Sequence, residues 1–384
     1  MKIALVHDWL VSFAGSERVI EQILAVFPDA DLFALVDFLP ESERGGIFKK
    51  ARTSFLQHVP FSRRHYRSYL PLMPFAVEHF DLSSYDLILS SSHAVAKGVR
   101  KQDGQLHICY CHTPMRYAWD LREQYLRESG LGTGLTGIAA RAVLERLRSW
   151  DARTATRVDH FIANSRYIAE RIRRSYGRES TVIYPPVDVE AFTVSRARDD
   201  FYLAASRMVP YKRMDLIVEA FKSLPDRKLI VIGDGPDFQK VSRRAGRNVR
   251  ILGHVPGNEL RAYLQTARAF IFAAEEDFGI IPVEAQACGT PVIAYGRGGA
   301  VETVVPLQTH GAERSADYHS APTGVFFEEQ TPESLVRAIH LFEDNAHRFD
   351  HDVIRSNAER FNTIRFKNEY RTFVEMKTTE REKA

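Results

Sequence analysis

Two glutamates eight positions apart, Glu276 and Glu284, mark the part of the sequence with the clearest chemical potential. Between them lie Phe278, Gly279, Ile280 and Ile281. The preceding apolar run predicts a strand over 269–274, and a helix is expected from about Ile280. The first amides of a helix lack intrahelical acceptors and bind anions such as phosphate. Carboxylates beside such a site can accept hydrogen bonds from sugar hydroxyls, or they can merely favour the helix N-terminus through its dipole.

Two cations follow another predicted strand. Arg207 and Lys212 lie between a predicted strand over 201–205 and a predicted helix over 214–224. A guanidinium and an ammonium at the end of a strand suit a diphosphate, because the first binds two oxygens at once and the second acts as a point charge. The alternative interpretation is a pair of solvated loop cations.

Glycine-containing turns are predicted at the same edge of the sheet. One turn, 233–236, follows a predicted strand over 229–232. The other consists of Gly253, His254 and Val255 and follows a predicted strand over 249–252. Glycine lets the backbone approach a ligand closely, although many strand-to-helix turns contain glycine without binding anything.

In the first half of the chain, Gly15 and His112 follow predicted strands over 3–7 and 106–111. Gly15 lies in a loop that leads into a helix, for which Ser16 is the predicted N-cap. The loop lacks the G-x-G-x-x-G pattern, which disfavours a dehydrogenase. A lone histidine is usually structural, but His112 is expected at the ligand-facing end of its strand.

These residues need parallel sheets to bring them together. Short apolar runs alternate with amphipathic patterns in both halves, which predicts βα units around sheets that are covered on both faces. The other predicted strands are 31–36, 87–91, 160–163, 182–184 and 291–294. The other predicted helices are 17–27, 138–157, 166–176, 258–267, 280–288, 333–343 and about 351–376. We predict an α/β fold of two Rossmann-like, doubly wound domains, 1–187 and 188–361, which face a cleft.

The composition narrows the class of protein. The 384 residues suit two to three domains, and a net charge of +3 provides no strong field for nucleic acid, so none is expected as a partner. With 45% hydrophobic and 26% charged residues the chain is not disordered. The N-terminal apolar run is too short for a signal peptide, and no apolar run approaches the roughly 20 residues of a membrane helix, so a cytoplasmic protein is expected.

Neither the cysteines nor a short acidic motif predicts a metal site. Cys109, Cys111 and Cys288 do not have redox or zinc spacing and are predicted to be buried and reduced. Asp29 and Asp31 form a D-x-D sequence, but it lies where a turn between a helix and a strand is expected. We therefore expect no metal and no other cofactor.

The sequence resembles the retaining glycosyltransferases of family 4, which have the GT-B fold. Residues 276–284 resemble the E-x7-E motif of that family, and residues 8–19 resemble its Gly-Gly loop, with Ala14 in place of the first glycine. Ser206 stands where many members have glycine. The resemblance implies that the first domain faces the acceptor, that the second binds the donor, and that a C-terminal helix of about 362–384 packs back on the first.

The resemblance also implies roles for the residues above. Arg207 and Lys212 would bind the donor diphosphate, and Gly15 would approach it closely. Glu276 and His112 would bind the donor sugar, together with the backbone of 278–281. Glu284 would bind the ribose, and the turn Gly253, His254 and Val255 would bracket the base. The implied catalytic residues are His112, Arg207, Lys212 and Glu276.

Residues 109–120, CYCHTPMRYAWD, most resemble bacterial mannosyltransferases of O-antigen and capsule synthesis, which use GDP-mannose. The predicted function is transfer of α-mannose from GDP-mannose, with retention, to a lipid-linked glycan in bacterial surface polysaccharide synthesis. Three alternatives stay open: a UDP- or ADP-sugar donor, a nucleotide-sugar epimerase, and a non-catalytic nucleotide-sugar binding partner.

Basic and aromatic residues raise the question of a membrane partner. One cluster combines four basic and seven apolar or aromatic residues between Phe61 and Phe75, and ten arginines lie within 141–178. Solvated helix faces would explain both. Contact with an anionic membrane, at the inner face of the plasma membrane, would also explain them and would suit a lipid-linked acceptor.

Overall fold

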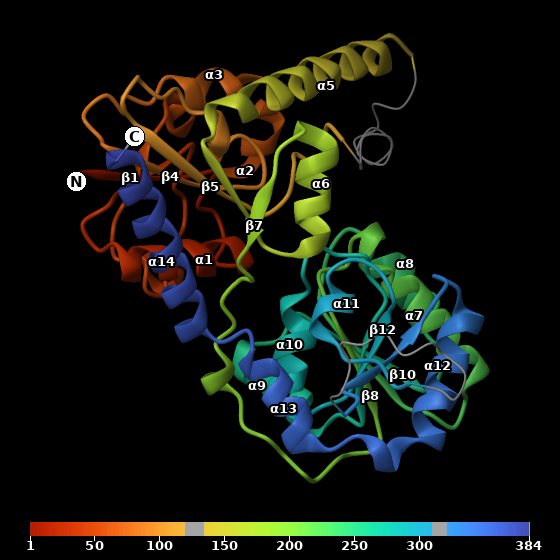
Figure 1. The fold of residues 1–384 in the computed structure, drawn as a ribbon. Coiled ribbons are helices and arrows are strands. Elements are labelled where there is room, and N and C mark those ends of the chain that lie inside the picture. The colour runs from red at the N-terminus through yellow and green to blue at the C-terminus, as the bar shows by residue number, and fades with distance from the viewer. Residues whose placement is uncertain (120–133, 309–320, 384) are drawn as a thin grey trace. The chain divides into compact units, whose positions relative to one another are not determined.

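The computed structural model describes residues 1–119, 134–308 and 321–383. The chain divides into two compact units (Figure 1). The first unit comprises Met1–Pro186 and Ile364–Ala384, and the second comprises Val187–Thr363. Each unit contains one parallel sheet with helices packed on it.

The sheet of the first unit has seven strands in the order β3-β2-β1-β4-β5-β6-β7. The strands are β1 (Ile3–His7), β2 (Asp31–Ala34), β3 (Arg52–Thr53), β4 (Leu87–Ser92), β5 (Leu106–Cys111), β6 (His160–Ala163) and β7 (Ser180–Val182). All neighbouring strands are parallel, so their carboxyl ends lie at one edge. Alternate residues of β1 enter different cores: Ala4 and Val6 pack on one face, and Leu5 packs on the other.

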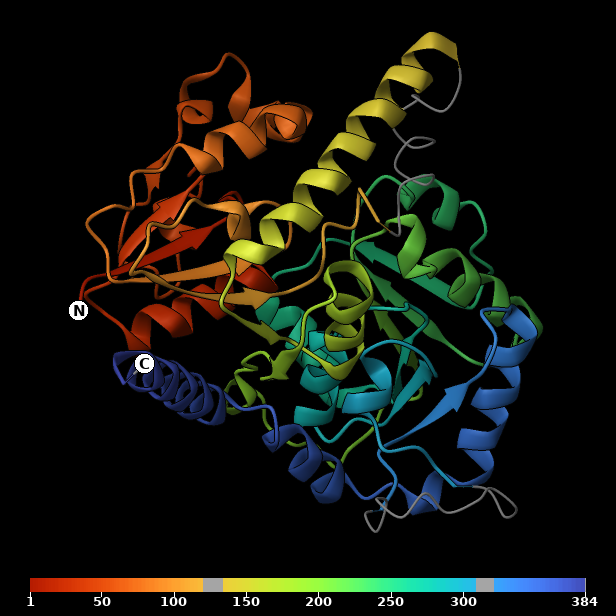
Figure 2. The same ribbon diagram turned by 45° about the horizontal axis from the view of Figure 1, so that its top comes forward.

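Helices cover both faces of this sheet. They are α1 (Gly15–Val26), α2 (Ser62–His65), α3 (Met73–Glu78), α5 (Gly134–Thr154), α6 (Arg166–Tyr176) and α14 (Thr363–Glu382). The C-terminal helix α14 packs its buried residues Phe366, Tyr370 and Phe373 with those of α1 on one face. Figure 2 shows α14, in blue, beside the red α1, and the rings of Phe27 and Tyr370 lie 6.4 Å apart. Helices α3 and α5 contribute to the core on the other face.

The second sheet has the strand order β10-β9-β8-β11-β12-β13, which is the 3-2-1-4-5-6 order of dinucleotide-binding folds. Its strands are β8 (Tyr202–Ala205), β9 (Leu229–Ile232), β10 (Val249–Gly253), β11 (Ala269–Phe272), β12 (Val292–Tyr295) and β13 (Gly324–Phe327). Its helices are α7 (Met214–Ala220), α8 (Phe238–Ser242), α9 (Gly257–Thr266), α10 (Ile280–Ala287), α11 (Ala300–Thr303), α12 (Pro332–Asp344) and α13 (His351–Glu359). The prediction of two doubly wound parallel sheets is therefore confirmed.

Several predicted elements differ in detail. The helix predicted over about 351–376 is two helices, α13 and α14, because the backbone between them bonds elsewhere: the amide of Val187 donates to the carbonyl of Phe361 at 2.9 Å. Strands β3 and β13 were not predicted, and β7 ends at Val182 rather than at Tyr184. The three cysteines are buried and free, as predicted.

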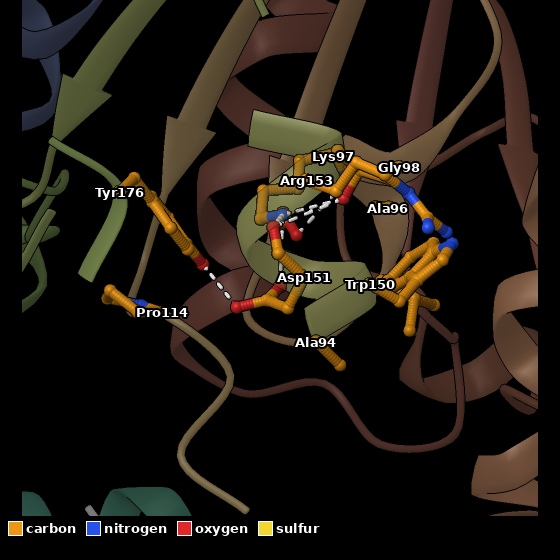
Figure 3. Close-up of polar contacts among 12 residues, drawn as sticks. Ala94, Ala96, Lys97, Gly98, Pro114, Trp150, Asp151, Arg153 and Tyr176 are labelled. Carbon is orange, nitrogen blue, oxygen red and sulfur yellow. Dashed lines mark hydrogen bonds and ion pairs between the residues drawn. The ribbon is translucent and has the colours of Figure 1, made fainter. Parts of the chain in front are cut away.

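A buried ion pair fixes the segment after β5 (Figure 3). The ammonium of Lys97 lies 2.9 Å from a carboxylate oxygen of Asp151 on α5, and both side chains are almost fully buried. The other carboxylate oxygen of Asp151 accepts hydrogen bonds at 2.8 Å from Trp119 and from Tyr176 on α6. The pair therefore joins four separate segments of the first unit.

Replacing Lys97 by methionine should destabilise the protein strongly, because the carboxylate of Asp151 would remain buried without its counter-ion. We expect a loss of about 3–5 kcal/mol in the free energy of unfolding, measured by urea denaturation. The matched control is Arg173→Met, which breaks an exposed ion pair with Glu170 and should cost less than about 1 kcal/mol. Equal effects of the two variants would contradict this account of Lys97.

Candidate functional site

The residues singled out in the sequence lie where strands of the two sheets end. In the second unit, Arg207 and Lys212 follow β8, His254 follows β10, and residues 276–281 follow β11. In the first unit, Gly15 follows β1 through a short loop, and His112 directly follows β5. Asp120, the last residue of the CHTPMRYAWD segment, lies outside the described residues.

The second unit contains a pocket of about 560 Å³ at the carboxyl edge of its sheet. Arg207, His254, Val255 and Ile281 line it, together with the turn at 233–235. The structure thus brings together residues from four separate segments of the second unit. The lining combines a guanidinium with apolar side chains and glycine backbone, which suits a ligand that has both a charged part and a flat part.

The turn at 233–235 holds the Arg207 loop in place through the backbone. The amide of Ser206 donates to the carbonyl of Ile232 at 3.0 Å, and the amide of Met208 donates to that of Asp234 at 2.8 Å. Gly233 has a φ of +134°, and a Cβ atom there would overlap the carbonyl oxygen of Ser206. Glycine is therefore required for the two loops to lie this close.

Lys212 and Glu276 form an ion pair, and both side chains are largely buried, with exposed fractions of 16% and 14%. The turn that positions Lys212 ends at Arg213, a residue with a left-handed φ of +53°. The guanidinium of Arg213 donates to the side-chain oxygen of Gln330 at 3.3 Å, and the side-chain nitrogen of Gln330 donates to the carbonyl of Ala273 at 2.8 Å. Sequence reasoning missed Gln330, because nothing near it in the sequence marks it.

The loop between Glu276 and α10 depends on glycines at 279 and 299. Gly279 is the N-cap of α10 and has a φ of +86°, a conformation that favours glycine. The amide of Gly299 donates to the carbonyl of Glu276 at 2.7 Å, and a Cβ atom on Gly299 would overlap the backbone of Phe278. The run Gly296-Arg297-Gly298-Gly299 after β12 was the signal that sequence reasoning passed over.

Phe278 and Glu284 are buried. Phe278 is 3% exposed, and its ring packs against that of Phe361 at 5.4 Å between centroids, so its side chain belongs to the core. Glu284 lies in the second turn of α10 and is 8% exposed. Pro282 occupies the first turn, as predicted, where its missing amide costs no hydrogen bond.

In the first unit, His112 lies in a group of buried polar side chains. Its Nε2 atom is 2.8 Å from the hydroxyl of Ser91, and its ring contacts that of Tyr110. Burial, with His93 and His7 nearby, holds the pKa of His112 well below its ordinary value, so the ring is neutral at neutral pH.

Asp8 stabilises the backbone that follows β4. Its carboxylate accepts hydrogen bonds of 2.6–3.0 Å from the amides of the four residues after β4, which are His93, Ala94, Val95 and Ala96. The sequence analysis did not name this group, although polar residues that end apolar strands (His7-Asp8 and Ser90 to His93) were a visible signal.

The start of α1 differs from the prediction. The N-cap is Ala14, not Ser16, and Gly15 is the first helical residue. The carboxylate of Glu17 accepts from the amide of Ala14 and from the hydroxyl of Ser16, both at 3.0 Å. Because Glu17 satisfies the N-cap amide itself, the helix can begin two residues earlier than a serine cap would allow.

Two family models match the chain. The model described as Glycosyltransferase Family 4 matches residues 15–191, and the one described as Glycosyl transferases group 1 matches residues 190–360. Together they extend over both structural units. The chain belongs to the family 4 glycosyltransferases. The predicted resemblance is confirmed at this level, whereas the closer likeness to O-antigen and capsule enzymes stays a prediction.

Curated relatives are similar to parts of this glycosyltransferase. A GDP-mannose-dependent monoacylated alpha-(1-6)-phosphatidylinositol monomannoside mannosyltransferase of Corynebacterium glutamicum is 30% identical over 39% of this chain and 48% of its own. A GDP-mannose-dependent alpha-(1-6)-phosphatidylinositol monomannoside mannosyltransferase of Mycolicibacterium smegmatis is 30% identical over 48% of this chain and 55% of its own. The chain spans about half the length of the curated relatives it matches.

Solved structures confirm the GT-B fold. HepE from Anabaena, crystallised in complex with UDP, matches with a TM-score of 0.66 at 18% identity and covers 98% of this chain and 100% of its own. Sucrose-phosphate synthase from Thermosynechococcus elongatus matches with a TM-score of 0.72 at 18% identity and covers 99% of this chain and 100% of its own. At such identities the likeness concerns the fold alone.

The part of this glycosyltransferase that the structure describes contains neither a helix suited to cross a membrane nor a cluster of metal-ligating side chains. None of its helices there has the length and apolar character that crossing a membrane requires. No group of three or more His, Cys, Asp or Glu side chains there has the arrangement of a metal site. Asp31 of the D-x-D sequence accepts a hydrogen bond from Tyr85 at 2.6 Å and lies 3.4 Å from Arg52.

Replacing Gly299 by alanine should disturb the loop at 276–279, because the new Cβ would overlap the backbone of Phe278. The φ of Gly299 is −66°, which alanine adopts easily, so any effect comes from this overlap. We expect a loss of about 1–3 kcal/mol in stability and a lower turnover. Gly257→Ala is the control, since no heavy atom lies within 4 Å of its added Cβ; wild-type behaviour of both variants would refute the argument.

Proposed function

We propose that the chain is a retaining hexosyltransferase that transfers α-mannose from GDP-mannose to a lipid-linked glycan in bacterial surface polysaccharide synthesis. The observation that carries the proposal is the meeting of Arg207, the Lys212–Glu276 pair and the start of α10 at one edge of a dinucleotide-type sheet. The names of two relatives state a dependence on GDP-mannose, which supports this donor.

Binding of the diphosphate would fall to Arg207 and Lys212, helped by the backbone amides of Gly279, Ile280 and Ile281. The leaving group is a nucleoside diphosphate, so catalysis consists largely of stabilising the negative charge that develops on it. The ion pair with Glu276 holds the ammonium of Lys212 in place before any ligand arrives. Two cations and a helix N-terminus can stabilise this charge without a metal ion, so we propose metal-independent catalysis.

The remaining residues would bind the rest of the donor. Glu276 and His112 would bind hydroxyls of the sugar, and Glu284 would bind those of the ribose. The turn of Gly253, His254 and Val255 would bracket the base, and Gly15 would let backbone approach the diphosphate. When the donor binds, the ammonium of Lys212 would shift from Glu276 toward a phosphate oxygen. The carboxylate of Glu276 would then be able to accept hydrogen bonds from the sugar.

Retention of configuration would follow a front-face course. The sequence offers no evident pair of carboxylates of the glycosidase type for the anomeric carbon. The bond from the anomeric carbon to the phosphate oxygen would break while the acceptor oxygen bonds to the same face. The acceptor proton would then pass to the departing phosphate oxygen.

A donor panel tests the proposal. Thermal unfolding would be followed with GDP-mannose, GDP-glucose, UDP-glucose, UDP-N-acetylglucosamine, ADP-glucose and NAD, each with EDTA, because a ligand of the folded state raises the melting temperature. We expect GDP-mannose to give the largest increase. Selective stabilisation by a UDP or ADP sugar would overturn the mannose assignment, and conversion of the donor without an acceptor would indicate an epimerase. Binding without any turnover on lipid-linked acceptors would indicate a non-catalytic partner.

Replacement of Arg207 or Lys212 by alanine should lower kcat by about 100-fold or more, because each removes a cation from the leaving group. The fold should survive, since both residues lie in the segment between β8 and α7 and neither is part of the apolar core. Lys222→Ala serves as the control, because this exposed lysine lies just after α7 and pairs with exposed Glu219 near the end of that helix. Unchanged turnover in both site variants would refute their role.

We further propose that the first unit touches an anionic membrane surface. Exposed apolar side chains, Phe61, Leu72 and Phe75, lie among the exposed cations Arg63, Arg64 and Arg67. Phe61 is 78% exposed and Phe75 is 56% exposed, so the apolar character is available to a partner. The patch is smaller than the sequence suggested, because Leu70 and Met73 are buried in the core. A surface of this kind would place the enzyme at the cytoplasmic face of the membrane beside its acceptor.

Binding to liposomes that contain anionic lipid should fall steeply with salt and should weaken when Phe61 and Phe75 are both changed to serine. Phe48→Ser is the control, since Phe48 is 92% exposed but lies outside the patch. Co-sedimentation measures the bound fraction. Absence of binding at low salt would refute the membrane proposal.

A further inference from the structure

Four polar side chains, of which His112 is half-buried and the others are buried, form a continuous line at the carboxyl edge of the first sheet. Glu17 on α1 lies 3.5 Å from Nε2 of His7, which ends β1. The Nδ1 atom of His7 lies 3.1 Å from the carbonyl oxygen and 3.2 Å from the hydroxyl of Ser91 on β4. The same hydroxyl lies 2.8 Å from Nε2 of His112. Glu17, His7 and Ser91 are buried, so water does not compete for these contacts.

The partners of His7 determine its charge. A backbone carbonyl only accepts hydrogen bonds, so Nδ1 of His7 carries hydrogen. The carboxylate of Glu17, 3.5 Å from Nε2, favours a second hydrogen there, because it would repel the lone pair of a bare nitrogen. His7 is therefore an imidazolium that is paired with Glu17. The surroundings of His7 favour this charge. Burial opposes it, but Glu17 and Asp8 raise the pKa of His7 above its ordinary value, and His7 in turn lowers the pKa of Glu17.

The other titratable groups around His7 do not replace Glu17. Asp8 faces His7 but is bonded to four backbone amides and lies 3.1 Å from His93. Burial lowers the pKa of His93, and burial also lowers that of His112, so both rings are neutral near pH 7. Arg67 acts on His93 from farther away.

The charge of His7 sets the direction of the next hydrogen bonds. The N–H at Nδ1 of His7 donates to the carbonyl and hydroxyl oxygens of Ser91. The hydroxyl of Ser91 therefore accepts from His7 and directs its own hydrogen to Nε2 of His112. Since His112 is neutral and accepts at Nε2, its hydrogen must lie on Nδ1.

We propose that Glu17, His7 and Ser91 are positioning residues that hold His112 as the neutral Nδ1–H tautomer, so that it donates a hydrogen bond to a hydroxyl oxygen of the donor sugar. The inference rests on the proposed function, which gives His112 this contact. This role would explain why the charged pair of Glu17 and His7 is buried beside the ligand-facing edge, although the fold alone does not require a charged pair there.

The tautomer can be measured without any ligand. In protein labelled with 15N at histidine, long-range 1H–15N NMR spectra distinguish protonated from bare ring nitrogens, and His112→Gln identifies the His112 signals among the 14 histidines. We expect hydrogen on Nδ1 of His112 in the wild type at pH 7.5, and Nε2–H signals in Ser91→Ala. Hydrogen on Nε2 in the wild type would overturn the inference even if Ser91→Ala failed to fold.

A second experiment measures the effect of His7 on turnover. Glu17→Gln keeps the hydrogen bond to the N-cap amide but removes the charge that raises the pKa of His7. The imidazolium always carries hydrogen on Nδ1, whereas neutral His7 can hold its single hydrogen on Nε2 and accept the hydroxyl hydrogen of Ser91 instead. Activity should therefore decline as pH rises through the pKa of His7. In Glu17→Gln this alkaline limb of the kcat profile should shift to lower pH. The control is Glu170→Gln, an exposed carboxylate on α6.

The outcomes separate the two proposals. A merely structural role of Glu17 would lower kcat equally at every pH, and that result would overturn the inference. If no nucleotide sugar stabilises the protein while the tautomer is as expected, the proposed function fails and the tautomer stands without a substrate. If GDP-mannose binds and His112 carries hydrogen on Nε2, the positioning inference alone fails.

Discussion

Parallel strand pairing is the constraint on which the rest of the structure depends. Every ladder of both sheets is parallel, so each strand delivers the residue after its carboxyl end to a common edge. Arg207, His254 and the loop at 276–281 come from strands β8, β10 and β11, yet they lie at the same edge of the sheet. His7, Ser91 and His112 meet in the first unit for the same reason, because β1, β4 and β5 are neighbours. Antiparallel pairing of any one strand would place its residue at the opposite edge.

Buried charge in the first unit is matched group by group. Asp8 is satisfied by four amides, Lys97 by Asp151 and Thr154, and His7 by Glu17. Each of these ions would be costly without its partner in a medium of low dielectric constant. Because these contacts must be kept, each of them holds loops from different strands in one arrangement. The loops that bear His112 and Trp119 are fixed in this way rather than by regular secondary structure.

In the second unit, backbone contacts between loops fix the positions of the site residues. Gly233 and Gly299 lie so close to the Arg207 and Glu276 loops that a side chain on either would overlap the neighbouring backbone. The resulting hydrogen bonds position Arg207 and Glu276 without help from their own side chains. The ion pair between Lys212 and Glu276 then fixes the side chains themselves.

The sequence by itself determined the class of fold and most of the candidate residues. Alternation of apolar runs with amphipathic stretches is a local property of βα units, and it located eleven of the strands that the structure contains, within a few residues. The spacing of Glu276 and Glu284 and the position of Arg207 after β8 are equally local. Only the tertiary structure decided which groups pair: Lys212 with Glu276, Gln330 with Arg213, Gly299 with Glu276, and Glu17 with His7. These partners are separated by 10 to 117 positions in the sequence, and no local pattern specifies which distant residue a strand order will bring to a given edge.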